Sequence, residues 1–151
     1  SDWCCGAGMS TDAIYTSFNK SKLIGVDTSY EMITVADRKS KSNAEFIIGN
    51  AENVKLEKKA DLITIMFGFH EIPQNGRLHI LKNAKKNLAK NGYLLVIDID
   101  LTYNPSKLML SGEPYIRDYF NFVQNDINSI FTNVQEKVII AGHVRQWLCK
   151  I

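Results

Sequence analysis

Apolar residues follow two different periods along the chain. Short, nearly continuous apolar runs alternate with longer segments in which apolar residues return every three or four positions. The first pattern predicts buried strands and the second predicts amphipathic helices. The predicted strands are residues 23–27, 45–48, 61–67, 93–99, 133–140 and 143–151, and the predicted helices are residues 9–20, 29–39, 74–90 and a last segment beginning at 113. Strands that alternate with helices are typical of an α/β fold with a mostly parallel sheet.

Turn residues refine the boundaries of these elements. Ser10 can cap the first helix, and Asn91-Gly92 is expected to close the helix 74–90 in a left-handed turn. Residues 100–112 are expected to form a loop. Only Ala141-Gly142 separates the last two predicted strands, and so short a connection permits only an antiparallel hairpin.

The chain begins inside its first predicted strand, of which only residues 1–4 stand ahead of the glycine turn. We therefore expect residues 1–151 to form a single domain that lacks its natural N-terminal region and any leader. A domain of this length buries roughly 68–70% of the surface that its unfolded chain exposes, so it needs no disulfide or metal for stability.

Composition and charge exclude several classes of protein. Apolar content of 45% and charged content of 23% are ordinary for a soluble domain, and a net charge of +2 does not indicate a nucleic-acid partner. The apolar runs are far shorter than a membrane span. The three cysteines show no CxxC spacing, which favours reduced thiols in the cytoplasm or another reducing compartment. Metal-ligand spacing is absent, so no metal is expected.

The candidate chemistry begins in residues 2–11, DWCCGAGMST. Gly6 and Gly8 let the backbone turn sharply and approach a ligand closely, and the N–H groups at the start of the following helix favour an anionic group. Asp27 stands about 20 residues further on, at the carboxyl end of the next predicted strand, where a carboxylate can accept two hydrogen bonds from a ribose diol. A carboxylate that only caps the next helix is the alternative.

Five segments in this order resemble the motifs of class I S-adenosylmethionine-dependent methyltransferases. They are DWCCGAG, GVDTSYEMI, IIGNAENV, DLITIMFGFHEIP and NLAKNGYLLVID, and together they span Asp2 to about Asp98. The resemblance is strongest to the small-molecule type 11 branch, which includes the ubiquinone and menaquinone biosynthesis enzymes. It implies a Rossmann-like methyltransferase fold, with a mostly parallel seven-stranded sheet of order 3-2-1-4-5-7-6, an antiparallel last strand and helices on both faces.

The resemblance also implies a set of residues that contact S-adenosylmethionine. These are Asp2, Gly6, Gly8, Asp27, Asn50, Ala51 and Phe67. In the family's loop at Asn50-Ala51, a side-chain carbonyl accepts a hydrogen bond from the adenine amino group. Asparagine replaces the usual aspartate here but keeps an acceptor oxygen; a simple turn is the alternative. Cys4 replaces the family's first glycine, and its thiol is expected to narrow the methionine end of the pocket.

A second set of residues is expected to bind the methyl acceptor, because the loops after strands four and five converge at one edge of the sheet. The set consists of Phe69, His70, Tyr103 and Tyr115, and Arg145 on the last predicted strand is added to it as a contact for an anionic substrate. His70 is the candidate general base, with an ordinary pKa near 6.5; a hydrogen bond to a backbone carbonyl is its alternative role. Glu71 is expected to bond the cofactor's ammonium or to face solvent. Arg145 either reaches an anionic substrate or lies at the edge of the core as a structural residue.

The chain is therefore expected to transfer the methyl group of S-adenosylmethionine to a small-molecule acceptor by in-line displacement. The sulfonium is already an activated leaving group, so the protein mainly aligns the reactants and excludes water. FHEIP lacks the signatures of DNA methyltransferases, and Glu71 alone does not form the metal site of the catechol type. Two alternatives stay open: a non-catalytic cofactor-binding domain of the same fold, and an NAD-dependent oxidoreductase, which Thr11 and the terminal hairpin disfavour.

Overall fold

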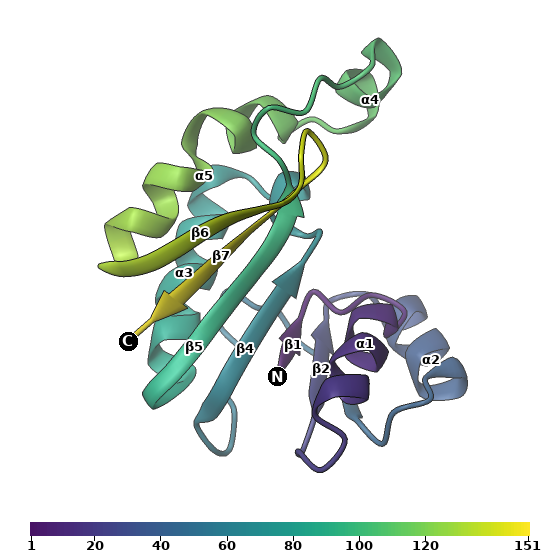
Figure 1. Cartoon of the computed structure of the whole chain (residues 1–151). Coiled ribbons are helices and arrows are strands. Elements are labelled where there is room, and N and C mark those ends of the chain that lie inside the picture. Colours follow the sequence, from purple (N-terminus) through teal and green to yellow (C-terminus); the bar gives the residue numbers. More distant parts are fainter.

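The computed structural model describes residues 1–151 as one seven-stranded sheet flanked by helices (Figure 1). The strands are β1 (Asp2–Trp3), β2 (Ile24–Asp27), β3 (Glu45–Ile48), β4 (Ala60–Met66), β5 (Leu88–Ile99), β6 (Asn133–Ile140) and β7 (Val144–Lys150). The helices are α1 (Met9–Ser17), α2 (Tyr30–Lys39), α3 (Gln74–Asn87), α4 (Lys107–Gly112) and α5 (Ile116–Ile130), with a short 3-10 turn, η1 (Phe69–Glu71). None of these helices has both the length and the apolar character that crossing a membrane requires.

The strands lie in the order β3-β2-β1-β4-β5-β7-β6, which confirms the order expected from the sequence. Neighbours from β3 to β5 pair in parallel, whereas β7 pairs antiparallel with both β5 and β6. The predicted hairpin is thus confirmed, and β7 lies inside the sheet while β6 forms its edge. Because β1, β2, β4 and β5 run in the same direction, the turns that follow them meet at one edge, the carboxyl edge.

The core lies against the central strands. Its largest fully buried side chains include Trp3 on β1, Trp147 on β7 and Phe69 in η1. Figure 1 shows α1 and α2 at the β1–β3 end of the sheet, and α3 packed against α5 towards β5 and β7. The fully buried Arg77 of α3 pairs with two aspartates of α5, one of them Asp126 at 3.0 Å, so the buried charge that joins these helices is compensated.

The expected boundary between α3 and β5 is wrong. Helix α3 ends at Asn87 and continues directly into β5, so Asn91-Gly92 lies inside a strand and not in a left-handed cap. The pairing of β5 with β4 is irregular at this point. A Cβ at Gly92 would come within 3.0 Å of the carbonyl oxygens of Ala60 and Ala89. The glycine therefore permits two backbone segments to approach each other.

Helix α1 begins at Met9, as predicted, but its capping residue and its C-terminal end differ from the prediction. Gly8, with φ +86, occupies the N-cap position, and the helix ends at Ser17. The hydroxyl of Ser10 does not cap the helix; it donates a hydrogen bond to the carboxylate of Asp2 at 2.6 Å. The N-cap position therefore belongs to the glycine turn and not to Ser10.

The predicted loop 100–112 contains the short helix α4. Ser106 caps this helix, because its Oγ accepts a hydrogen bond from the N–H of Met109 at 3.2 Å. No residue of α4 is buried, and Leu108 is 83% exposed. Met109 and Leu110 pack only partly against the core. The three apolar residues of this short helix are consecutive, so they show no helical period and the sequence pattern does not predict the helix.

Candidate cofactor and acceptor site

The glycine turn after β1 is the first part of the site. Gly6 has φ +51, and no atom lies within 4 Å of the position that a Cβ would occupy, so this glycine leaves open space for a ligand. Gly8 is different, because a Cβ there would lie 3.2 Å from the ring of Phe46 and 3.3 Å from the methyl group of Ala36. Gly6 therefore faces open space, whereas Gly8 lets the turn pack closely against α2 and β3.

Asp27 ends β2 beside this turn, and the backbone holds its carboxylate in place. Oδ2 accepts a hydrogen bond from the N–H of Gly6 at 2.9 Å, and Oδ1 accepts one from the N–H of Ser29 at 2.9 Å. A carboxylate offers about four acceptor positions, so positions remain for the two hydroxyls of a ribose. The capping role that was the alternative for Asp27 is present, and it is compatible with the expected ribose contact.

Asp2 lies beneath the turn. Its side chain is buried, and its carboxylate accepts hydrogen bonds from the hydroxyls of Ser10 at 2.6 Å, Thr11 at 2.7 Å and Thr64 at 2.7 Å. These bonds tie β1 to α1 and β4. The expected direct contact between Asp2 and the cofactor does not fit this burial, because three hydroxyls already surround the carboxylate. Asp2 instead positions the turn.

Cys4 adopts a backbone conformation that favours glycine. Its φ of +57 lies in the left-handed region, which costs a residue with a Cβ about 1–2 kcal/mol. A Cβ at Gly68, after β4, would lie only 3.1 Å from the Cβ of Cys4, so the turns after β1 and β4 are close neighbours. Burial raises the pKa of the Cys4 thiol to about 12, which keeps this thiol neutral.

The loop after β3 holds the residues that are expected to bind adenine. Asn50 is exposed, and its Oδ1 accepts a hydrogen bond from the N–H of Glu52 at 2.8 Å. Ala51 is buried, and its carbonyl accepts a hydrogen bond from the side chain of Asn83 at 2.9 Å. The loop is therefore a tight turn, as in the alternative interpretation. A carbonyl oxygen has two lone pairs, so Asn50 can still accept a bond from an adenine amino group.

The chain turns sharply at the end of β4. Phe67 has φ +55, and its N–H donates to the carbonyl of Ile97 at 2.8 Å. Its side chain is 50% exposed at the carboxyl edge, where a cofactor contact was expected. Phe69 is fully buried in the core, so the expectation that it lines the acceptor site is wrong. The 3-10 turn η1 packs against α5, and this packing takes the ring away from the edge.

A buried carboxylate that the sequence did not reveal holds His70. Nδ1 of His70 lies 2.7 Å from Oδ1 of Asp98, which is fully buried at the end of β5. The same carboxylate accepts hydrogen bonds from the backbone N–H groups of Phe69 at 2.8 Å and Ile99 at 2.7 Å. The imidazole therefore bonds a carboxylate through Nδ1, and not the backbone carbonyl of the alternative interpretation. Burial alone would lower the pKa of His70, but the hydrogen bond to Asp98 and the nearby carboxylate charges raise it above its ordinary value.

Arg145 belongs to a separate ion-pair network. Its Nε donates to Oδ1 of Asp100 at 2.7 Å, and its guanidinium also pairs with Glu136. The Thr102 hydroxyl donates to Asp100 at 2.6 Å, and this bond together with the guanidinium lowers the pKa of Asp100 to about 2. The expected contact of Arg145 with an anionic substrate does not fit, because two carboxylates already compensate its charge. The structural alternative fits this geometry.

The two tyrosines of the expected acceptor set have different neighbours. Tyr115 is 39% exposed and follows Glu113 by two positions in the chain. The carboxylate of Glu113 lies in one cluster with the ring of His70, so this tyrosine belongs to a segment that reaches the candidate site. Tyr103 packs against His143, with ring centroids 5.8 Å apart. Its closest aromatic partner is thus in the β6–β7 turn.

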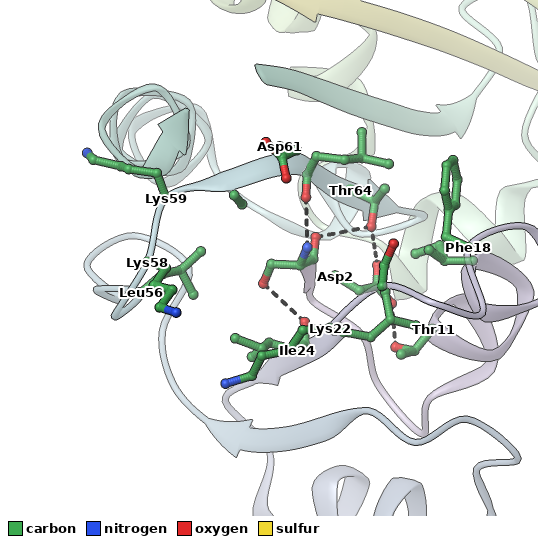
Figure 2. Close-up of a pocket in the computed structure, with 16 residues that line it drawn as sticks. Asp2, Thr11, Phe18, Lys22, Ile24, Leu56, Lys58, Lys59, Asp61 and Thr64 are labelled. Atoms are coloured by element: carbon green, nitrogen blue, oxygen red, sulfur yellow. Dashed lines mark hydrogen bonds between the residues drawn. The ribbon is translucent and has the colours of Figure 1, made fainter. Parts of the chain in front are cut away.

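A large hollow lies at the opposite edge of the sheet (Figure 2). Its volume is about 380 Å³, and the starts of β2 and β4 line it together with β1 and α1. Figure 2 shows Phe18 and Leu56 on its walls and Asp2 within its hydrogen-bond network. Neither Asp27 nor His70 lines this hollow, so it is not the expected acceptor cavity.

The fold has many relatives among solved structures. The plantazolicin methyltransferase BpumL, in complex with a triazolic desmethylPZN analog and SAH, matches with a TM-score of 0.73 and 19% identity, over 99% of this chain and 75% of that chain. The PH0226 protein from Pyrococcus horikoshii OT3 matches with a TM-score of 0.75 and 20% identity, over 99% of this chain and 79% of that chain. At such low identity these matches establish the fold alone.

Sequence comparison connects the same region to methyltransferases. Malonyl-[acyl-carrier protein] O-methyltransferase 2 of Coxiella burnetii (strain RSA 493 / Nine Mile phase I) is 40% identical over 70 residues. That match covers 45% of this chain but only 28% of the length of that curated relative. Residues 1–92 match the family model described as a methyltransferase domain.

Together, the sheet order and the turns at its carboxyl edge define a Rossmann-like fold of the class I methyltransferase type. The match over residues 1–92 covers more than half of the sequence. The chain therefore belongs to the methyltransferase domain family. This membership sets aside the NAD-dependent oxidoreductase that was one of the alternatives.

Proposed function

We propose that this chain binds S-adenosylmethionine at the carboxyl edge of its sheet and transfers the methyl group to a small-molecule acceptor. The observation that carries the proposal is the Asp27 carboxylate, which the N–H groups of Gly6 and Ser29 hold beside the open side of the glycine turn. A fixed carboxylate next to a turn without side chains suits a ribose diol. Membership of the methyltransferase domain family supports this cofactor.

Further residues are assigned to the cofactor by their positions. Asn50 and Ala51 are proposed to contact adenine through a side-chain oxygen and a backbone N–H, and the exposed ring of Phe67 offers an apolar wall. Gly8 acts indirectly, because it permits close packing behind the turn. Asp2 also acts indirectly, through the hydroxyls that hold β1 and α1 together.

Methyl transfer requires little acid–base chemistry from the protein. The sulfonium activates the leaving group, so alignment and exclusion of water are the main contributions. We assign His70 the one proton transfer: Asp98 accepts the Nδ1 proton in a hydrogen bond, and Nε2 can take a proton from an acceptor hydroxyl. The acceptor is therefore proposed to be small and to carry a hydroxyl. The desmethylPZN analog in the structure of the similar BpumL supports a small acceptor.

The test measures release of S-adenosylhomocysteine from S-adenosylmethionine with a panel of phenolic and aliphatic hydroxyl acceptors. We expect acceptor-dependent release that Asp27→Ala lowers roughly 30- to 1000-fold at subsaturating S-adenosylmethionine. If His70→Asn leaves the rate unchanged, the proton-transfer role is wrong while methyl transfer stands. Binding of S-adenosylmethionine without turnover of any acceptor would favour the non-catalytic alternative, and absence of binding would refute the proposal.

The thiols support a reducing compartment such as the cytoplasm. Cys4, Cys5 and Cys149 form no disulfide, and free buried thiols are typical of proteins kept under reducing conditions. Fractionation of cells that produce the natural protein tests this localisation.

A further inference from the structure

Three ligand-type side chains gather beside the candidate acceptor site. His70 and Glu71 come from η1, and Glu113 comes from the segment between α4 and α5. One nitrogen or carboxylate oxygen from each residue lies within 4.8 Å of the others. Nε2 of His70 is 3.8 Å from Oε1 of Glu71. Two segments far apart in the sequence therefore direct one nitrogen and two carboxylates into the same space.

The imidazole of His70 is oriented in the way that metal sites require. Metal-binding histidines almost always donate their other ring N–H to a carboxylate, a carbonyl or a water, and this bond fixes the tautomer. The buried Asp98 carboxylate provides such a bond at Nδ1. His70 is only 8% exposed, yet its Nε2 forms no hydrogen bond. This nitrogen is thus available as a ligand in a largely buried position.

The charge of the cluster favours a cation. Neither lysine nor arginine pairs with Asp98, Glu71 or Glu113. The other buried aspartates that form ion pairs, Asp100 and Asp126, are each paired with an arginine. The carboxylates of Glu71 and Glu113 repel each other and that of Asp98, which bonds the other ring nitrogen of His70. A divalent cation bound by Glu71 and Glu113 would offset this repulsion.

We propose that His70, Glu71 and Glu113 bind a divalent transition-metal cation of the Zn²⁺ type. Imidazole nitrogen favours Zn²⁺, Fe²⁺ or Ni²⁺, whereas Mg²⁺ and Ca²⁺ favour oxygen ligands alone. The sequence shows no metal-ligand spacing and Glu71 alone forms no site, but the fold brings Glu113 to it. Three protein ligands leave a further coordination position for water or for an acceptor.

Coordination requires the cluster to contract. Ligands about 2.1 Å from a tetrahedral ion lie roughly 3.4 Å from one another, whereas the ligand atoms here spread over as much as 4.8 Å. Glu71 is exposed and Glu113 is half-buried, and neither carboxylate accepts a hydrogen bond. Both side chains can therefore rotate towards Nε2 of His70 without disturbing the core.

The site goes beyond the proposed methyl transfer and does not depend on it. A cation on Nε2 would take the lone pair that we assign to proton removal, and it would instead lower the pKa of a hydroxyl bound beside it. A titration with the metal alone therefore tests the role of His70 as a metal ligand and leaves its role in proton removal to the methyl-transfer assay. It uses neither cofactor nor acceptor, so its failure leaves the proposed methyl transfer intact.

The experiment titrates Zn²⁺ into the metal-stripped full chain at neutral pH by calorimetry, and Co²⁺ by visible absorption. We expect a single saturable site whose affinity falls roughly tenfold or more in His70→Asn and in Glu113→Gln. Asp98→Asn should weaken binding about 10- to 100-fold, because it disturbs the orientation of the imidazole. The matched control is His79→Asn, which removes an exposed histidine that lies 3.0 Å from Glu52 and should change the affinity less than about twofold.

Glu113→Gln is the decisive variant, because the carboxylate of Glu113 forms no ion pair whose loss would affect folding. The proposal is overturned if no saturable binding occurs, if Glu113→Gln binds Zn²⁺ like the wild type, or if His79→Asn weakens binding equally. It is also overturned if S-adenosylhomocysteine displaces the metal, since the carboxylates would then serve the cationic end of the cofactor.

Discussion

Replacement of Asp27 by alanine is the most direct test of the cofactor site. The carboxylate of Asp27 is proposed to accept hydrogen bonds from both ribose hydroxyls of S-adenosylmethionine. Charge-assisted hydrogen bonds contribute about 1.5–3 kcal/mol each. Asp27 is only partly buried, and water replaces part of the lost interaction. We therefore expect Asp27→Ala to weaken binding by about 2–4 kcal/mol, or roughly 30- to 1000-fold. Asp27→Asn should lose less, because the amide keeps one acceptor oxygen.

The structure adds a second effect to this substitution. Alanine also releases the N–H groups of Gly6 and Ser29, which Asp27 accepts at 2.9 Å each. Water can reach both groups, so we expect the free energy of unfolding to fall by only about 1–2 kcal/mol. A variant that loosens the turn could weaken binding even if the carboxylate never contacts the ribose. The assay therefore needs a control for stability.

Asp12→Ala is a matched control in the same half of the molecule. The Asp12 carboxylate also holds backbone, accepting hydrogen bonds from the N–H groups of Lys41 and Ser42 at 3.1 Å. Its loss should lower stability by a similar amount and leave cofactor affinity unchanged. Calorimetric titration with S-adenosylmethionine, together with thermal melts, compares the two variants. The ribose assignment is refuted if folded Asp27→Ala binds within about threefold of wild type, or if Asp12→Ala loses as much affinity.

Three further predictions follow from the strained and buried side chains. Cys4→Gly should relieve the left-handed backbone strain, and this gain should offset the greater conformational entropy that glycine gives the unfolded chain. The free energy of unfolding should therefore change by less than about 1 kcal/mol. Cys4→Ala keeps the strain and should be less stable than Cys4→Gly in urea titrations. Burial raises the pKa values of all three thiols, Cys4, Cys5 and Cys149, to about 12. At mildly alkaline pH these thiols should react with iodoacetamide far more slowly in the native protein than in denaturant. Equal rates, read by mass spectrometry, would contradict this. Asp100 has a folded pKa of about 2, lowered by the Thr102 hydroxyl and the neighbouring guanidinium, so its ionised form stabilises the fold above its unfolded pKa of about 3.9. Asp100→Asn should therefore melt lower than wild type at neutral pH, and the gap should narrow as pH falls from about 4 to about 2.

The order of the strands was predictable because a local signal and a family resemblance agreed. The short Ala141-Gly142 connection requires a hairpin, and the resemblance of the motifs to the methyltransferase family implies the order of the parallel strands. Gly92 was misassigned for a physical reason. A glycine after a helix usually marks a left-handed cap, but here tertiary packing against the carbonyls of Ala60 and Ala89 explains it. Nothing in the sequence near Gly92 distinguishes these two uses.

The parts of the candidate site that the backbone forms could be predicted from the sequence. The glycine turn and Asp27 depend on residues close to each other in the βαβ unit. Phe69 was wrongly assigned because its place in a motif does not specify the direction of its side chain, which the packing of η1 against α5 determines. Asp98 was missed, although a carboxylate at the end of a buried, apolar strand was a usable signal. Glu113 carried no such signal, because only the fold brings it to His70.

The candidate site has a cofactor half around Asp27 and an acceptor half around His70. These halves differ in how completely their polar groups are paired, and this difference constrains the proposed acceptor. Around Asp27, backbone N–H groups already hold the carboxylate, so that half is organised before any ligand binds. Around His70, acceptors exceed donors, because neither Glu71 nor Glu113 pairs with a lysine or an arginine. A ligand that brings another carboxylate would add repulsion there, and Arg145 is engaged elsewhere. The acceptor half therefore suits a ligand that brings hydroxyl protons or a cation.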